Sequence, residues 1–209
     1  MLDDKLRENF LSGEEIYNGK IIKVERWQVS LPNGQTAPRE IVRHNGAAAI
    51  VPIDAAGNVT LVRQYRVAVG RFTWEIPAGK LDSPDEDPFH AARRELEEET
   101  GLQAENWQLL NRIDTTPGFC TERIAIYLAT GLSQQNAHPD EDEFLGLTKM
   151  PLDEAVALCM AGEIHDSKTL VGLLMAQKAL AKTDMPSVPL HAPIQRGMVI
   201  HSSQNGKEI

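Results

Sequence analysis

One segment constrains this chain more than any other, because residues 88–100 are predicted to form a helix with three glutamates on one face. Glu95, Glu98 and Glu99 stand at positions i, i+3 and i+4, which brings their carboxylates together within about one turn. Like charges at this spacing repel one another and mildly destabilise a helix. A hard divalent cation such as Mg²⁺ would neutralise them, since it takes oxygen ligands and keeps several waters of its own.

Acidic residues are concentrated in the same region of a chain whose formal net charge is −9. Eight carboxylates lie between residues 82 and 99: Asp82, Asp85, Glu86, Asp87, Glu95, Glu97, Glu98 and Glu99. A solvated helix face is the simpler reading of such a run. That face would usually mix in Lys or Arg, whereas here only Arg93 and Arg94 precede the glutamates, and Arg94 is placed to pair with Glu97 or Glu98. The negative charge argues against duplex nucleic acid as a partner.

The protein is expected to be cytoplasmic. The longest apolar runs, such as residues 47–51, are too short to cross a bilayer, so no membrane partner is expected. The first residues are charged and lack the apolar core of a signal peptide. Cys120 and Cys159 form neither a metal-ligand spacing nor a disulfide framework.

Strand signals dominate the first eighty residues. Two turns of the same kind are predicted, at residues 32–34 and 54–58, and each is flanked by two strands. The strands are expected at residues 21–31, 37–44, 47–53 and 59–65, and further strands at 73–76, 107–115, 123–130 and 143–149. Helices are expected at residues 88–100, 153–161 and 167–182, with Asp87 and Asp166 as N-caps and Gly101 as a C-terminal stop.

These elements predict an α/β (α+β) fold, a mixed β-sheet sandwiched by helices, with an N-terminal antiparallel β region. We expect residues 1–45 to form that β region and to mediate dimerisation, and residues 46–182 to form the catalytic domain. Residues 183–209 contain several prolines and little periodicity, so they are expected to form a tail.

The acidic helix and the loop before it closely resemble the signature of the Nudix hydrolases. The matching residues are Gly79, Glu86, Arg94, Glu95, Leu96, Glu98, Glu99, Gly101 and Leu102. One departure exists, because six residues separate Gly79 from Glu86 where the common pattern has five. The additional residue falls in the loop at residues 80–85, where a change of length is tolerated. The resemblance implies that Arg94 orients the glutamates and that Glu86 braces loop and helix, although an ordinary surface pair is the alternative for these two.

The same resemblance implies a Nudix fold and a metal site for Mg²⁺ or Mn²⁺. Glu95 and Glu99 would be the principal ligands, with Glu98 a further ligand and the backbone carbonyl of Ala78 completing the first site. Gly79 would allow the loop to approach closely, because it has no Cβ.

Motifs outside the helix resemble the ADP-ribose pyrophosphatase branch of the family. They are residues 62–66, residues 74–79 and residues 116–119, in which Pro117 follows Gly101 by sixteen positions. This branch implies hydrolysis of a nucleoside diphosphate derivative, ADP-ribose, to AMP and ribose 5-phosphate by metal-activated water. The alternatives are another nucleoside diphosphate sugar, such as GDP-mannose, and a non-catalytic nucleotide-sugar sensor.

The resemblance also implies residues that bind substrate. Arg66 would pair with phosphate, Glu75 would contact a polar group of the substrate, and Pro117 would accompany ADP-ribose specificity. Members of the branch are homodimers with an exchanged N-terminal β region, and Arg39 resembles an arginine that reaches into the partner's site. Trp27 would stack on adenine, although packing in a core or an interface is the commoner fate of a tryptophan.

The catalytic base is expected among the glutamates that follow the helix, while Glu98 would assist catalysis from within it. Glu143 matches a loop glutamate to which the family assigns this role, and it precedes an apolar stretch that could anchor it. Glu122 is the next candidate, although it could instead orient the substrate or pair with Arg123. Glu141 lies among other acids, where solvation is the simplest account.

Overall fold

Two units make up the part of the chain that the computed structural model describes, residues 3–134 and 144–181. The first unit comprises the described residues up to His44 together with Gly118–Thr121, and the second comprises the described residues of 45–117 and 122–181. The hydrogen bond from the Val42 amide to the Phe119 carbonyl, at 2.7 Å, shows how the short segment 118–121 joins the first unit.

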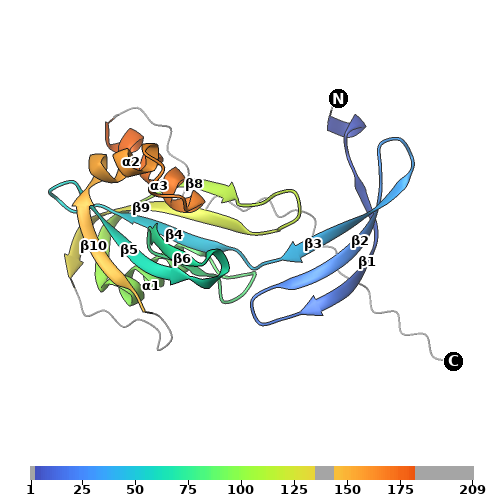
Figure 1. Ribbon diagram of the computed structural model, residues 1–209, viewed down its shortest axis with the longest axis horizontal. Coiled ribbons are helices and arrows are strands. Elements are labelled where there is room, and N and C mark those ends of the chain that lie inside the picture. Colours follow the sequence, from blue (N-terminus) through green and yellow to red (C-terminus); the bar gives the residue numbers. More distant parts are fainter. Residues whose placement is uncertain (1–2, 135–143, 182–209) are drawn as a thin grey trace. The chain divides into compact units, whose positions relative to one another are not determined.

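The first unit is an antiparallel sheet with the strand order β1-β2-β3. A 3₁₀ turn at Asp3–Lys5 precedes β1 (Asn9–Asn18), β2 (Lys23–Ser30) and β3 (Thr36–Arg43) (Figure 1). The predicted hairpin between β2 and β3 is confirmed, and Gly34 adopts a φ of 83° in its turn. β1 was not predicted as a separate strand, since its sequence alternates weakly and almost all of its residues are exposed.

The second unit contains two sheets. The four-stranded sheet has the order β7-β4-β9-β8 and the three-stranded sheet has the order β10-β5-β6. Their bounds are Ala47–Pro52 (β4), Asn58–Arg66 (β5), Arg71–Glu75 (β6), Ala78–Lys80 (β7), Leu102–Asp114 (β8), Arg123–Gln134 (β9) and Gly146–Pro151 (β10), with a 3₁₀ turn at Val67–Val69. β4 runs parallel to β9 and antiparallel to β7, so the larger sheet is mixed.

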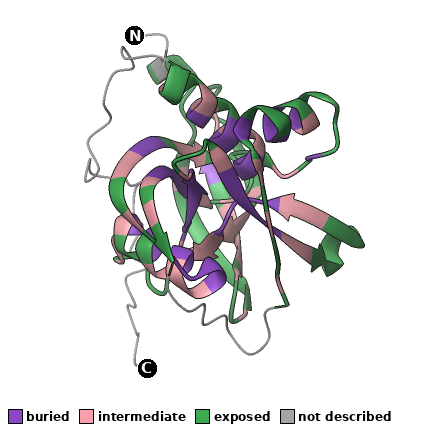
Figure 2. Ribbon diagram, turned by 90° about the vertical axis from the view of Figure 1, so that its left-hand side faces the viewer, coloured by how far each residue is buried: buried purple, intermediate pink, exposed green. Residues whose placement is uncertain are grey.

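Three helices cover the sheets: α1 (Pro88–Thr100), α2 (Leu152–Met160) and α3 (Ser167–Ala181). Figure 1 shows α1 on one side of β4 and β9, with α2 and α3 on the other. β4 is buried along its whole length, because Ala48 and Ile50 pack in the cluster that contains α1 while Ala49 and Val51 pack in the cluster that contains α2 and α3. Buried residues accordingly follow these strands in Figure 2. The predicted fold class is confirmed.

The expectation of two similar turns is wrong at the second turn. Residues 54–58 connect β4 and β5, which belong to different sheets and share a single bridge, between Ile53 and Val59. The turn itself forms as its composition predicts, because the Asp54 carboxylate accepts hydrogen bonds from the amides of Ala56 and Asn58. The sequence of the turn predicted its local hydrogen bonds. It did not predict the partner of β4, which is β9, a strand that lies far along the chain.

Local signals set the ends of α1. Asp87 caps the helix by accepting a hydrogen bond from the Phe89 amide at 2.9 Å, Pro88 occupies the first position, and Gly101 ends it with a φ of 67°. Both cysteines are free thiols. Among the described helices, none has the length and apolar character needed to cross a membrane.

Candidate active site

Two of the three predicted acidic ligands face inward from α1. Glu95 is 8% exposed and Glu99 is 5% exposed, because the i, i+4 spacing turns both toward β7. Glu98 is half-buried. The Glu99 carboxylate accepts a hydrogen bond from the Ala78 amide at 3.1 Å, which ties the C-terminal half of α1 to β7. The structure therefore brings Ala78, Glu95 and Glu99 together, while their role as metal ligands stays a prediction.

Gly79 provides the space in which the Glu95 carboxylate lies. A Cβ added to Gly79 would stand 2.0 Å from the carboxyl carbon of Glu95 and 2.0 Å and 2.3 Å from its two oxygens. No side chain larger than hydrogen fits without displacing that carboxylate. The glycine is required here for close approach rather than for an unusual backbone angle.

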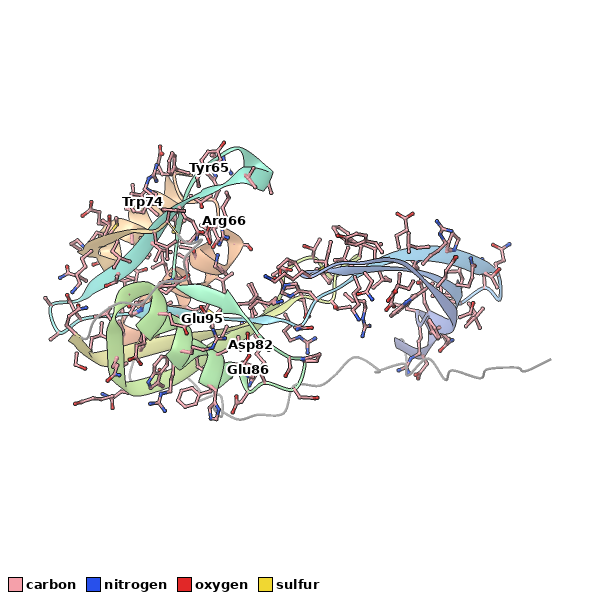
Figure 3. The ribbon with its side chains drawn as sticks, turned by 90° about the horizontal axis from the view of Figure 1, so that it is seen from below. Tyr65, Arg66, Trp74, Asp82, Glu86 and Glu95 are labelled. Atoms are coloured by element: carbon pink, nitrogen blue, oxygen red, sulfur yellow. The ribbon has the colours of Figure 1, made fainter. Side chains whose placement is uncertain are left out.

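Arg94 is the positive centre of the acidic cluster. Its Nη1 atom lies 2.6 Å from Glu95 and 3.2 Å from Glu98, and its Nη2 atom lies 3.6 Å from Glu86 and 3.9 Å from Asp82. Figure 3 shows Asp82, Glu86 and Glu95 gathered in this region. Burial lowers the pKa of the Arg94 guanidinium, but the four carboxylates outweigh it and raise the pKa overall. Glu98 is one of the two partners expected for Arg94.

Glu86 braces the lengthened loop, because its Oε2 atom accepts a hydrogen bond from the Asp82 amide at 2.6 Å. The Leu81 amide donates to the Gly46 carbonyl at 3.0 Å, so the loop is also fastened to the start of β4. The additional residue between Gly79 and Glu86 is thus absorbed between two fixed points, and α1 keeps its register.

The donor chemistry of this cluster fits a hard divalent cation. One guanidinium faces four carboxylates within 4 Å, so its single positive charge leaves most of the negative charge uncompensated. All the side-chain donors are oxygens, the ligands that Mg²⁺ and Mn²⁺ prefer. In the described part of the chain, no three His, Cys, Asp or Glu side chains converge as a finished ligand set. The carboxylates are instead held by Arg94 and by the Ala78 amide.

A second charged cluster is centred on Glu75, at the end of β6. Arg66 donates two hydrogen bonds of 2.8 Å to its two oxygens, Thr73 donates at 2.6 Å, and Lys168 donates to Oε2. Burial alone would raise the pKa of Glu75, but the hydrogen bonds from Arg66 and the positive charge of Lys168 lower it to about 2. Glu75 is 2% exposed. Its direct contacts are therefore with these side chains, where the sequence led us to expect a polar group of the substrate.

Arg66 connects this cluster to the acidic helix. Its side chain, labelled in Figure 3, binds Glu75 and keeps 46% of its surface exposed. The hydrogen bonds that Arg66 donates to Glu75 are the largest cause that raises the pKa of the Arg66 guanidinium, and the charges of Asp166 and Glu99 raise it further. A fixed and accessible guanidinium near Glu99 is suited to bind a phosphate beside the predicted metal ligands.

Lys168 and Thr169 are members of this cluster that the sequence did not reveal. Lys168 comes from the first turn of α3 and lies 93 positions from Glu75. Asp166 caps the helix as predicted, accepting hydrogen bonds from the Thr169 amide and hydroxyl at 3.0 Å and 2.6 Å.

The remaining predicted residues lie in several places. Pro117 is exposed and Glu122 is half-buried in the second unit, where Glu122 accepts a hydrogen bond from the Thr115 hydroxyl at 2.8 Å. Arg123 pairs with Asp114, at 2.7 Å, through its Nε atom. Glu143 and the tail 183–209 lie outside the described residues.

Trp27 and Arg39 belong to the first unit. The Trp27 indole donates to Glu25 at 2.6 Å and packs edge-on against Phe10, with ring centroids 5.1 Å apart. Arg39 makes a bidentate pair with Glu8, at 3.0 Å and 2.5 Å. The hydrogen bond to Glu8 is the main cause that raises the pKa of the Arg39 guanidinium.

Comparison with known protein families matches the NUDIX domain over residues 42–170, well over half of the chain. The chain belongs to the Nudix family. The matched range contains the Nudix signature helix, Gly79 and the Arg66–Glu75 pair, so the family assignment and the geometry of the site concern the same residues.

Three Nudix relatives show how far the similarity extends. A protein of Bacillus methanolicus named methanol dehydrogenase activator is 44% identical over 83% of this chain and 95% of its own length. An ADP-ribose pyrophosphatase of Mycobacterium tuberculosis is 44% identical over 78% of this chain and 80% of its own length. A crystal structure of an ADP compounds hydrolase superposes with a TM-score of 0.75 at 25% identity, covering 84% of this chain and 96% of the other.

Proposed function

We propose that this Nudix protein hydrolyses the pyrophosphate bond of ADP-ribose and releases AMP and ribose 5-phosphate. The observation that carries the proposal is the pair of buried carboxylates Glu95 and Glu99, with the exposed guanidinium of Arg66 in the electrostatic reach of Glu99. Acidic ligands beside a phosphate-binding arginine suit cleavage of a bond between two phosphates. The relative from Mycobacterium tuberculosis, which bears the name ADP-ribose pyrophosphatase, supports this choice of substrate.

Glu95, Glu98 and Glu99 would hold Mg²⁺, or Mn²⁺ in its place, together with the backbone carbonyl of Ala78. When bound, the cation supplies a water of lowered pKa and offsets the charge of the phosphates. The protein's own part is to keep the carboxylates in place. Arg94 orients Glu95 and Glu98 through hydrogen bonds of 2.6 Å and 3.2 Å, and Gly79 leaves the space that Glu95 occupies.

Separate residues of the chain have separate roles in the hydrolysis. One water is consumed, one P–O bond of the pyrophosphate breaks, and two phosphate monoesters form with release of protons. Arg66 binds a substrate phosphate, and Glu75 fixes the plane of its guanidinium. Glu143 accepts the proton of the attacking water, with Glu122 as the second candidate, and Pro117 contributes to specificity for ADP-ribose.

We further propose that the enzyme is a homodimer whose first unit supplies part of the substrate site. A three-stranded sheet needs one face covered to be stable. Within one chain β1 exposes Leu11, Ile16 and Tyr17, and a second copy would cover them. In this dimer Arg39 would reach the substrate and Trp27 would stack on its adenine. The two free thiols fit a cytoplasmic enzyme.

Arg39→Ala tests the contribution of the first unit. Because Arg39 would bind a part of the substrate remote from the reacting bond, the substitution should raise KM about tenfold with little change in kcat. Arg26→Ala is the matched control, since Arg26 also pairs with a glutamate on this sheet, Glu14, at 3.7 Å. Light scattering of the same samples should report a dimer. A monomer with full activity would contradict this part of the proposal.

A substrate panel tests the proposed reaction. Purified protein would be incubated with Mg²⁺ and ADP-ribose, GDP-mannose or other nucleoside diphosphate sugars, and the products resolved by chromatography. We expect kcat/KM for ADP-ribose to exceed every other value by about tenfold or more, which corresponds to about 1.4 kcal/mol in transition-state binding. A preference for GDP-mannose would move the assignment to that sugar nucleotide, and binding without turnover of any compound would indicate a sensor.

A further inference from the structure

Lys168 is a buried lysine that none of the metal or substrate roles described above uses. It is 8% exposed at the first turn of α3. Its ammonium group donates to Oε2 of Glu75 and, at 3.0 Å, to Oδ2 of Asp166. Lysine is almost never buried unless it is paired, and here two carboxylates compensate its charge.

The same turn of α3 also holds the backbone that leads to the metal ligands. The hydroxyl of Thr169 accepts a hydrogen bond from the Ile76 amide at 2.9 Å. The Ile50 amide donates to the Pro77 carbonyl at 2.9 Å, and the Ala78 amide donates to Glu99. Residues 75 to 78 are therefore each fixed to a neighbouring element, the first two to α3, Pro77 to β4 and Ala78 to α1, and the chain has little freedom before it reaches Gly79.

Glu75 lies between Lys168 and Arg66. Oε2 of Glu75 accepts from both Lys168 and Nη2 of Arg66, while Oε1 accepts from Nε of Arg66. A bidentate pair fixes the plane of a guanidinium only if the carboxylate itself cannot rotate. Lys168 blocks that rotation from the buried side. It also balances the charge of Asp166, which would otherwise attract Arg66 away from the substrate.

We propose that Lys168 is a positioning residue for phosphate binding. It fixes the Glu75 carboxylate, and through it the guanidinium of Arg66, so that Arg66 is directed at the pyrophosphate before the substrate arrives. Lys168 itself touches neither substrate nor metal. This inference rests on the proposed role of Arg66 in binding a phosphate, but it does not depend on which sugar nucleotide is the substrate.

The test is a double-mutant cycle on binding of imidodiphosphate, a pyrophosphate analogue with a nitrogen bridge, in the presence of Mg²⁺. The variants are Lys168→Met, Glu75→Gln and the combination of both, measured by calorimetry. Lys168→Met should weaken binding about tenfold, as expected for loss of an oriented charged hydrogen bond. In the Glu75→Gln background the same change should weaken binding less than about twofold, because Lys168 acts through Glu75. Additive effects of the two substitutions would overturn the proposal.

Two further variants separate positioning from simple stability. Lys168→Arg retains the charge and should recover binding to within about threefold of the parent, while Lys178→Met removes an exposed lysine of the same helix and should leave it unchanged. If Lys168→Met does not fold, Lys168→Gln, which also removes the charge, takes its place in the cycle. A thermal melting temperature lowered by Lys168→Met without any change in imidodiphosphate affinity would show a structural role and overturn the proposal.

The cycle also remains decisive if the proposed substrate is wrong. When ADP-ribose is turned over, Lys168→Met should raise KM about tenfold and change kcat less, because it disturbs a phosphate contact of ground and transition state alike. When ADP-ribose is not turned over, the proposed function fails while the imidodiphosphate cycle still reports on Lys168. Failure of the parent protein to bind imidodiphosphate would overturn the positioning role, since Arg66 would then have no phosphate to hold.

Discussion

Gly79 and the carboxylate of Glu95 occupy what is in effect a single site, since a Cβ on Gly79 would stand 2.0 Å from the carboxyl carbon of Glu95. The Glu95 side chain cannot move aside easily, because it is 8% exposed and Arg94 donates a hydrogen bond of 2.6 Å to it. β7 and α1 are therefore fitted to each other at the point where the metal ligands are proposed. The match between strand and helix sets the position of the Glu95 carboxylate.

Gly79→Ala should displace the Glu95 carboxylate and reduce kcat about a hundredfold, the effect expected when a reacting group is misplaced by about 1 Å. The control is Gly146→Ala on β10, where a new Cβ would meet its nearest neighbour at an ordinary 3.7 Å. Circular dichroism should report a folded protein in both cases. Parental kcat and parental Mg²⁺ affinity in Gly79→Ala would contradict the proposed role of Glu95.

Glu99→Gln should preserve the fold and weaken Mg²⁺ binding. In the parent protein the Ala78 amide donates a hydrogen bond of 3.1 Å to the Glu99 carboxylate, and the glutamine oxygen can still accept it. The substitution removes the negative charge. Turnover at limiting Mg²⁺ should fall by about tenfold or more and recover in part at high Mg²⁺. Glu97→Gln on the same helix changes the charge equally and serves as the control. Near-normal turnover of Glu99→Gln at limiting Mg²⁺ would count against Glu99 as a ligand.

The features that the sequence predicted are those encoded over short distances. The cap at Asp87, the stop at Gly101 and the i, i+4 spacing of Glu95 and Glu99 all act within a few residues, so α1 and its acidic face could be derived directly. The Lys168–Glu75 pair joins residues 93 positions apart, and no local pattern reports such a contact.

Strand pairing shows the same limit. The turn at residues 54–58 has the composition of a hairpin turn and forms its expected hydrogen bonds, yet β4 and β5 enter different sheets. β4 pairs in parallel with β9, from Ala47 opposite Ile124 to Pro52 opposite Ala129. A parallel partner needs a long crossover connection, so its choice depends on how the whole unit packs and cannot be taken from the turn.

Separate Glu143→Gln and Glu122→Gln variants test the assignment of the base. A base variant should lose about a hundredfold or more in kcat while still binding Mg²⁺, because proton transfer is impaired and the ligands are intact. We expect this loss for Glu143→Gln. Glu122→Gln should retain kcat within about threefold. The amide oxygen of the glutamine can still accept the hydrogen bond that the Thr115 hydroxyl donates to Glu122, at 2.8 Å, in the parent protein. The reverse pattern would move the role to Glu122.

Glu75 should make stability depend on pH in the acidic range. Its pKa is lowered from 4.5 to about 2 in the folded protein, so it contributes stability that is present above pH 4.5 and is lost as the pH falls toward 2. The contribution is on the order of 2 to 3 kcal/mol, where the lower value allows for solvent screening. Urea unfolding at pH 7, 4.5 and 3 should show the parent and Glu75→Gln converging as the pH falls. A constant difference would contradict the lowered pKa.

Tyr127→Phe should stabilise the protein. The Tyr127 hydroxyl is buried in the core beneath α1 and has no hydrogen-bond partner among the described residues. Burial raises its pKa to about 12, so the group remains neutral in ordinary buffers. Removing an unsatisfied hydroxyl should gain about 1 kcal/mol, a rise of roughly 2–4 °C in Tm for a chain of this size. Tyr65→Phe, at an exposed position, should leave Tm unchanged. A lower Tm for Tyr127→Phe would show that the hydroxyl is hydrogen-bonded.

The most direct test of the account is hydrolysis of ADP-ribose in ¹⁸O-labelled water with Mg²⁺, followed by mass spectrometry of the products. Cleavage of the pyrophosphate bond by water predicts AMP and ribose 5-phosphate in equal amounts, with one ¹⁸O atom in the phosphate of one of them. The reaction should stop when Mg²⁺ is chelated and should resume when it is restored. Formation of ADP and free ribose would contradict cleavage of the pyrophosphate bond, and turnover that persists after chelation would contradict the dependence on a metal.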